Sequence, residues 1–242
     1  MPTQHTHAWA PGPLQPQLGA GTVHVWRADL TQVDDEVCGL LCDQERARAE
    51  RILRELDRQL WRRSRGLLRA LLGRYLQEDP RVLRFSVGSH GKPALTADAI
   101  DSKPTPRRSS IEPARFSFNM AHSGRLALYA FSESGAVGVD VEVARREIDE
   151  VAIAGRVFGS ARARCLEGLD PAVRRQEFLR MWACHEAELK CLGVGIGRAD
   201  LANETRRPWI AELEPGPGAA GAVATERPAR ELCCWDWWPS SQ

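Results

Sequence analysis

The 242-residue sequence lacks the segments that would direct a chain into or across a membrane. Its N-terminus has no basic start followed by an apolar run, and no window approaches ~18 uninterrupted apolar residues. The formal net charge is only +1, so the chain as a whole is not attracted to nucleic acid or to acidic lipid. We expect a cytoplasmic protein with no nucleic-acid or membrane partner, whose electrostatic function resides in local patches.

The cysteines also lack the spacing of a structural framework. There are seven, none of them in a C-x-x-C pair, and no histidine lies at zinc-finger distance from them. An odd number of thiols without paired spacing argues against a disulfide scaffold and against a structural zinc site. We expect mostly buried, reduced thiols.

Length and composition are those of an ordinary globular protein, with 43% hydrophobic and 27% charged residues. Residues 1–20 are rich in Pro, Gly and Gln and predict a flexible N-terminal tail. Residues 98–115 carry three prolines and no periodicity, which predicts a linker. The sequence therefore divides into an N-terminal subdomain at 21–112 and a C-terminal subdomain at 113–242.

An arginine-rich amphipathic segment dominates the N-terminal half. Alternation at residues 23–28 predicts a strand, and leucines at helical spacing predict one or two helices within 43–76. The leucines are Leu53, Leu56, Leu60, Leu67, Leu71 and Leu72. The arginines on the other side are Arg48, Arg51, Arg58, Arg62, Arg65 and Arg69. Few acids lie nearby, so this arginine stripe is either a solvated basic face or a binding site for phosphate, which guanidinium groups bind bidentately.

The C-terminal half alternates between strand and helix patterns. Residues 116–143 predict a three-stranded β-meander with a polar turn at 119–124. Helical spacing then predicts helices at 148–163 and 173–192. The remaining strand-like segments are 208–213, 221–225 and 232–238.

Two carboxylates share one face of the last strand of that meander. Successive side chains of a strand point to opposite faces, so Asp140 and Glu142 lie together while Val139 and Val141 lie opposite. Adjacent like charges repel each other unless a cation lies between them. The pattern indicates a site for a hard metal ion. The alternative is a half-buried strand whose polar face meets water.

Two smaller patterns could also carry chemistry. Trp182, Glu186 and Lys190 are spaced by four and share a helix face, where the Glu–Lys pair could equally be a surface ion pair worth about 0.3–0.5 kcal/mol. His122 and Ser123 end the expected polar turn, where a histidine can simply satisfy backbone groups.

Three motifs in fixed order connect these patterns. They are F-N-x-x-H-S at residues 118–123, G-V-D-V-E at 138–142 and W-x-x-x-E-A-x-x-K-x-x-G-x-G at 182–195. Together they resemble the Sfp-type 4′-phosphopantetheinyl transferases, over roughly residues 22–238. The resemblance implies an α+β fold built as a pseudo-two-fold pair of similar α/β subdomains, with the active site between them. It also implies a monomer, because the trimeric members of the family are about half as long.

The resemblance implies a specific reaction. Such enzymes transfer the 4′-phosphopantetheine arm of coenzyme A to a serine of an apo acyl or peptidyl carrier protein. The reaction depends on Mg²⁺ and releases adenosine 3′,5′-bisphosphate, as in holo-acyl-carrier-protein synthases. The N-terminal subdomain would bind coenzyme A, and the C-terminal subdomain would carry the metal and the catalytic helix.

Each role is carried over by motif. Asp140, Glu142 and Glu186 would hold Mg²⁺, and the catalytic residues would be Glu186, Lys190 and Asp140. Glu186 would serve as, or position, the base for the carrier serine. The coenzyme A contacts would be Arg48, Arg51, Lys92, Asn119, Met120, Ala121, His122, Ser123, His185 and Lys190.

One departure from the family pattern leaves other functions open. The family usually has lysine immediately before the helix glutamate, and this chain has His185. A catalytically weakened relative that only binds coenzyme A or a carrier is therefore an alternative. A Mg²⁺-dependent phosphohydrolase built on the same carboxylates is another. A serine hydrolase using His122 and Ser123 is disfavoured, because no G-x-S-x-G elbow surrounds the serine.

Overall fold

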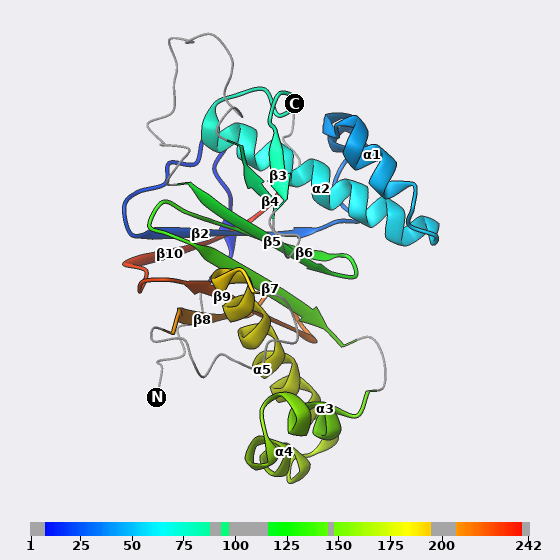
Figure 1. Cartoon of the computed structure of the whole chain (residues 1–242), viewed down its shortest axis with the longest axis vertical. Coiled ribbons are helices and arrows are strands. Elements are labelled where there is room, and N and C mark those ends of the chain that lie inside the picture. Colours follow the sequence, from blue (N-terminus) through cyan, green and yellow to red (C-terminus); the bar gives the residue numbers. More distant parts are fainter. Residues whose placement is uncertain (1–7, 88–92, 97–115, 145–147, 195–206, 239–242) are drawn as a thin grey trace.

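The computed structural model describes residues 8–87, 93–96, 116–144, 148–194 and 207–238 (Figure 1). Two β-sheets lie face to face, and each carries one 22-residue helix on its outer side. The layers therefore run from helix α2 through a five-stranded sheet and a three-stranded sheet to helix α5. Among the described residues, no helix combines the length and apolarity needed to span a lipid bilayer.

The five-stranded sheet has the order β1-β10-β2-β6-β5, and the three-stranded sheet has the order β7-β9-β8. The strands are β1 Ala10–Pro11, β2 Thr22–Asp29, β3 Phe85–Val87, β4 Pro93–Leu95, β5 Ser117–Ser123, β6 Leu126–Ser132, β7 Val137–Val143, β8 Trp209–Leu213, β9 Ala219–Thr225 and β10 Glu231–Asp236. The helices are the 3₁₀ helix η1 Asp35–Leu40, α1 Asp43–Ala49, α2 Glu55–Leu76, α3 Glu150–Val157, α4 Ser160–Glu167 and α5 Pro171–Leu192. Strands β3 and β4 form a separate ribbon.

The same unit of structure occurs twice. In each, a strand leads to a 22-residue helix and then to an antiparallel hairpin whose second strand pairs with the first strand. The first unit is β2-α2-β5-β6 and the second is β7-α5-β8-β9. The expected mixed α/β fold with a pseudo-two-fold pair is confirmed. Strand β10 follows the second unit but pairs with β2, so the large sheet takes strands from both predicted subdomains. The boundary near residue 112 stays a prediction.

The expected β-meander is wrong at its last strand. Strand β7 pairs with β9 and belongs to the second sheet, although it runs beside β5. Two side chains of β5, rather than its backbone, accept hydrogen bonds from the backbone of β7. Asn119 Oδ1 accepts the N–H of Val139 at 2.9 Å, and Ser123 Oγ accepts the N–H of Val143 at 3.2 Å. The expected polar turn at 119–124 is therefore also wrong, because residues 119–123 continue β5 and the turn begins at Gly124.

The helix expected at 148–163 is two helices. Gly159 separates α3 from α4 with a φ of +88°, a conformation that L residues rarely adopt. In α2, Leu60 and the later leucines are buried as expected. Leu53 and Leu56 are 96% and 57% exposed, because the helix begins only at Glu55 and its first turn extends beyond the core.

The N-terminal segment contacts the large sheet from its first described residues onward. Strand β1 pairs in parallel with β10, and Trp9 Nε1 donates to the carbonyl of Glu214 at 2.8 Å. The Trp9 ring also lies 4.5 Å from the Arg27 guanidinium. Residues 8–20 thus differ from the flexible tail that their composition predicts, since aromatic and backbone contacts hold them.

Helix α5 approaches β7 closely because Gly138 has no side chain. A Cβ at this position would overlap the carbonyl oxygen of Ala187 and the amide nitrogen of Cys191. Alanines line the rest of the contact, with Ala183 and Ala187 of α5 packing on Ala222 and Ala224 of β9. Small residues on both surfaces bring the helix backbone down onto the strand.

We expect Gly138→Ala to lower the free energy of unfolding by about 3 kcal/mol or more, because backbone atoms cannot rotate away from the added methyl group. The matched control is Gly155→Ala in α3, where the new Cβ would lie 3.6 Å from Ala163 Cβ, an ordinary contact. The control should stabilise the protein by up to about 1 kcal/mol, since alanine favours helix. Urea unfolding measures both changes. A Gly138→Ala protein as stable as the wild type would contradict the close packing.

Candidate active site

The two faces of β7 differ in chemistry as their alternation predicts. Val137, Val139 and Val141 are buried in the core between the sheets. Gly138, Asp140 and Glu142 lie on the opposite face, toward α5. The close approach over Gly138 therefore brings the two carboxylates of the strand next to the helix.

Glu186 and Lys190 of α5 meet these carboxylates. Lys190 Nζ lies 2.5 Å from Asp140 Oδ1, and Asp140 and Glu186 are each only 5% exposed. One oxygen of each buried acid, Oδ2 of Asp140 and Oε1 of Glu186, has no hydrogen-bond partner among the described residues. A buried carboxylate oxygen without a partner is costly, so these two oxygens are suited to a cationic ligand.

The electrostatics of the acids reflect their proximity. Burial raises the pKa of Asp140 to about 7, against the opposing effect of Lys190 and with further increases from Glu142 and Glu186. Burial also raises the pKa of Glu186, again opposed by Lys190 and reinforced by Glu142. Glu142 thus makes ionisation of both buried acids harder, and Glu186 adds to the effect on Asp140, so a divalent cation would relieve the repulsion among these carboxylates.

The residues fit Mg²⁺ when its ordinary coordination is considered. Within the described part of the chain, no three His, Cys, Asp or Glu side chains are arranged to hold a metal by themselves. Mg²⁺, however, usually takes one or two carboxylates and completes its shell with water and substrate phosphate. Asp140 and Glu186 each offer one buried oxygen, and Glu142 lies beside them, so this donor set suits a hard cation.

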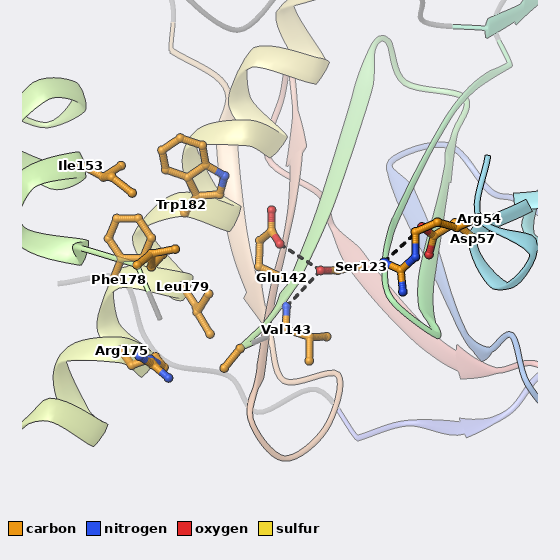
Figure 2. A pocket seen from close by; sticks show the side chains of 12 residues that line it. Arg54, Asp57, Ser123, Glu142, Val143, Ile153, Arg175, Phe178, Leu179 and Trp182 are labelled. Atoms are coloured by element: carbon orange, nitrogen blue, oxygen red, sulfur yellow. Dashed lines mark hydrogen bonds and ion pairs between the residues drawn. The ribbon is translucent and has the colours of Figure 1, made fainter. Parts of the chain in front are cut away.

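A cleft of about 550 Å³ opens beside Glu142 (Figure 2). One wall is apolar and is formed by α5, α3 and a residue that precedes α3. Its residues are Ile148, Ile153, Phe178, Leu179 and Trp182. Arg54 and Asp57, at the start of α2, lie on the other side, with Ser123 between them and the carboxylate. The cleft thus joins both repeated units at the carboxylate site.

Comparison with known proteins identifies the family of the chain. A family model described as the 4′-phosphopantetheinyl transferase superfamily matches residues 136–233. The chain is also 31% identical over 233 residues to the 4′-phosphopantetheinyl transferase HetI of Nostoc sp., covering 90% of this chain and 93% of HetI. The chain belongs to the 4′-phosphopantetheinyl transferase superfamily. The resemblance inferred from its three motifs is confirmed.

Other superfamily members align over shorter stretches. The chain is 36% identical over 157 residues to the putative 4′-phosphopantetheinyl transferase slr0495 of Synechocystis sp., covering 65% of this chain and 58% of slr0495. It is 28% identical over 130 residues to the transferase Sfp of Bacillus subtilis, covering 54% of this chain and 50% of Sfp. At the level of the family, the predicted enzyme class, a phosphopantetheinyl transferase, is confirmed.

The motif at 118–123 does not present all its side chains to one site. His122 is exposed, whereas Asn119 and Ala121 are buried and Met120 packs half-buried against the core beneath α2. Of this motif, only Ser123 lines the cleft. Two other parts of the resemblance, Lys92 and the end of the third motif at 195, lie outside the described residues.

The arginine stripe is more neutralised than its sequence surroundings predict. Glu45 of α1 accepts hydrogen bonds from Arg65 Nε through Oε1 and from Arg69 Nε through Oε2, both at 2.6 Å. Arg69 is 1% exposed, so it holds α1 and α2 together. The expectation of an unneutralised stripe is therefore wrong for this part, because the acid comes from another helix. Arg48, in the last turn of α1, and Arg51, two residues beyond its end, are exposed.

His185 faces the packing contact between α5 and α3. Its ring centroid lies 5.4 Å from that of Phe158 and 6.3 Å from that of Trp182, in edge-on arrangements. Burial there lowers the pKa of His185, so the ring is neutral near pH 7. On α5 it is one residue, and thus about 100°, away from Glu186. These contacts indicate a packing role.

Several residues around the cleft carried no motif. In the sequence, Arg54 and Arg175 stand among charged residues typical of a solvent-exposed surface. Only folding brings both of them to one cleft. Trp182 and Gly138 did carry a signal. Trp182 shares the four-residue spacing of Glu186 and Lys190, and Gly138 shares the alternation of the two strand carboxylates.

We expect the metal-free protein to lose stability as the pH rises from about 4 to about 7. The pKa of Asp140 is about 7 in the folded protein against an ordinary value of 3.8, so the folded state holds an extra proton in this window. Above pH 7, the cost of ionising Asp140 is on the order of 4 kcal/mol.

Asp140→Asn is the control for this pH dependence, because it removes the titration and keeps the shape. Its free energy of unfolding, measured in urea with a chelator present, should fall much less over the same window. The pKa of Glu186 is raised as well, so the Asp140→Asn variant should keep a smaller dependence of its unfolding free energy on pH. Equal slopes in the wild type and the variant would show that Asp140 is not the buried titrating group.

For the His185→Phe variant, we expect the new phenyl ring to replace the packing contacts of the imidazole. The dissociation constant for coenzyme A, measured by calorimetry, should change by less than about threefold. A His185→Lys variant with a clear loss of thermal stability would agree with the packing role. An increase of about tenfold or more in the dissociation constant of His185→Phe would instead identify a coenzyme A contact.

Proposed function

We propose that this protein transfers the 4′-phosphopantetheine arm of coenzyme A to a serine of an apo acyl or peptidyl carrier protein in a Mg²⁺-dependent reaction. The observation that supports it best is the pair of buried carboxylates, Asp140 and Glu186, beside the Lys190 ammonium, each with one oxygen that has no hydrogen-bond partner among the described residues. A structural ion pair would not need a second buried acid of this kind. A monomer in the cytoplasm is part of the same proposal.

Asp140, Glu142 and Glu186 would hold Mg²⁺, which would supply positive charge to neutralise the pyrophosphate of coenzyme A. Lys190 provides further positive charge for the pyrophosphate, a role supported by its partial exposure of 30% at the edge of the site. Charge neutralisation of this kind is the main contribution that a protein makes to displacement at phosphorus.

The proton of the carrier serine passes to the Glu186 carboxylate, or to a water that Glu186 orients. A carboxylate at the metal site is a workable proton acceptor for the serine hydroxyl. The serine oxygen forms a bond to the phosphorus that bears pantetheine. The bond from that phosphorus to the bridging oxygen breaks, and adenosine 3′,5′-bisphosphate leaves with the electron pair.

We assign the nucleotide end of coenzyme A to the basic N-terminal part. Arg48 and Arg51 would contact the 3′-phosphate, together with His122 and Lys92. The exposure of Arg48, Arg51 and His122 supports this assignment, because each side chain can reach a ligand. The cleft is lined by Glu142, next to the carboxylate site, and suits the reacting end of the substrates.

The carrier protein would dock beside the cleft through its acidic helix. Leu53, 96% exposed, and Leu56, 57% exposed, flank the cleft residue Arg54. Exposed leucines next to an arginine suit a partner surface that is both apolar and acidic. They are therefore the carrier contacts that we propose.

Intact-mass spectrometry of apo carrier proteins tests the activity. After incubation with coenzyme A and Mg²⁺, the wild type should add one phosphopantetheine mass to the carrier, and Asp140→Ala should add none. Binding of coenzyme A without a mass increment on any carrier would favour the non-catalytic relative. Phosphate-ester hydrolysis without a protein acceptor would favour the phosphohydrolase.

We expect Arg48→Ala and Leu53→Ala to separate the two substrates. Arg48→Ala should raise the KM for coenzyme A about tenfold with little change for the carrier, because a charge-assisted phosphate contact is lost. Leu53→Ala should raise the KM for the carrier several-fold with little change for coenzyme A. Steady-state kinetics with one substrate varied at a time measures both constants. The reverse pattern would exchange the two assignments.

A further inference from the structure

The hydroxyl of Ser123 has two partners, and both belong to β7. It accepts the backbone N–H of Val143 at 3.2 Å and donates to Glu142 Oε2 at 3.0 Å (Figure 2). Ser123 is 9% exposed and lies at the last position of β5. It therefore joins the first repeated unit to one carboxylate of the second.

The direction of each hydrogen bond follows from the chemistry of the groups. A backbone N–H only donates, so Ser123 Oγ must accept from Val143. An ionised carboxylate only accepts, so the single hydroxyl proton must point to Glu142. The hydroxyl thus acts both as a donor and as an acceptor, and its two partners on β7 fix its rotation. A hydrogen bond to a charged acceptor is also stronger than one between neutral groups.

The hydrogen bond to one oxygen of Glu142 restricts the orientation of its carboxylate. Glu142 is half-buried at the cleft, where an unrestrained glutamate has several rotamers to choose from. It lies two residues after Asp140 in β7, so both carboxylates are on the strand face toward α5, where Glu186 lies. Groups that orient metal-ligating side chains commonly tune the affinity of the metal.

We propose that Ser123 is a positioning residue, whose hydrogen bond holds Glu142 toward Asp140 and Glu186 for binding a divalent cation. The proposal rests on the metal site of the proposed function and goes beyond it. It assigns Ser123 to the metal site. The family resemblance instead implies that this serine contacts coenzyme A.

Asn119 supplies the matched control. It lies four residues earlier on the same face of β5 and accepts the N–H of Val139 at 2.9 Å. Asn119 Oδ1 therefore joins β5 to β7 as Ser123 does, but its valine partner follows Gly138, whereas the valine partner of Ser123 follows Glu142. A purely structural role for Ser123 would make the two residues alike in their effect on metal binding.

Calorimetric titration of the coenzyme-A-free protein with Mn²⁺, used as a probe for Mg²⁺, tests the proposal. Ser123→Ala should weaken the Mn²⁺ affinity about tenfold, and Ser123→Thr, which keeps the hydroxyl, should restore it. In a Glu142→Gln background, Ser123→Ala should cause no further loss, because the group that it positions is already changed. Asn119→Ala should lower the thermal stability without a comparable change in Mn²⁺ affinity.

Three outcomes would overturn the proposal. The Mn²⁺ affinity of Ser123→Ala could equal that of the wild type, its loss could persist in the Glu142→Gln background, or Asn119→Ala could weaken Mn²⁺ binding as strongly. Each of these leaves the metal site and the transfer reaction intact. Failure of the wild type to bind Mn²⁺ would overturn this proposal and the metal site together, and failure of transfer to the carrier would be detected separately by mass spectrometry.

Discussion

The close contact between α5 and β7 determines how this protein arranges its charges. Gly138 lets the helix backbone approach the strand, and that approach buries Asp140 and Glu186 while Lys190 remains partly exposed at the edge. Two acids and one lysine in so small a space do not neutralise one another. The remaining repulsion adds to burial in raising the pKa of both acids. The fold therefore holds an electrostatic strain that a divalent cation and an anionic substrate would relieve.

The two repeated units differ in the contact between their first strand and the end of their long helix. In the first unit, His24 and Trp26 of β2 both contact the hydroxyl of Tyr75, near the end of α2, each at 2.9 Å. Burial lowers the pKa of His24 to about 4, so this contact is neutral at physiological pH. In the second unit, the corresponding contact joins Asp140 of β7 to Lys190, near the end of α5. The first unit thus has an uncharged, aromatic core where the second has its charged site.

Much of the site could be predicted because its parts are local in sequence. The alternation around Asp140 and Glu142 fixes their shared face, and the four-residue spacing of Glu186 and Lys190 fixes theirs. The pairing of β7 with β9 could not be predicted, since nothing local distinguishes it from a meander. The same holds for Asn119 and Ser123, whose polarity suggests a turn until their partners on β7 are known. Glu45 neutralises Arg65 and Arg69 from a neighbouring helix, which helical spacing within one segment does not reveal.

On this reading of the structure, β7 and α5 together form one divalent-cation site. Anomalous diffraction from crystals grown with Mn²⁺ and coenzyme A tests it directly, because the metal identifies its own ligands. We expect an anomalous peak in contact with carboxylate oxygens of Asp140 and Glu186, with Glu142 beside it and the pyrophosphate completing the coordination. A peak at other residues, or fully ordered coenzyme A at this position without any peak, would contradict it.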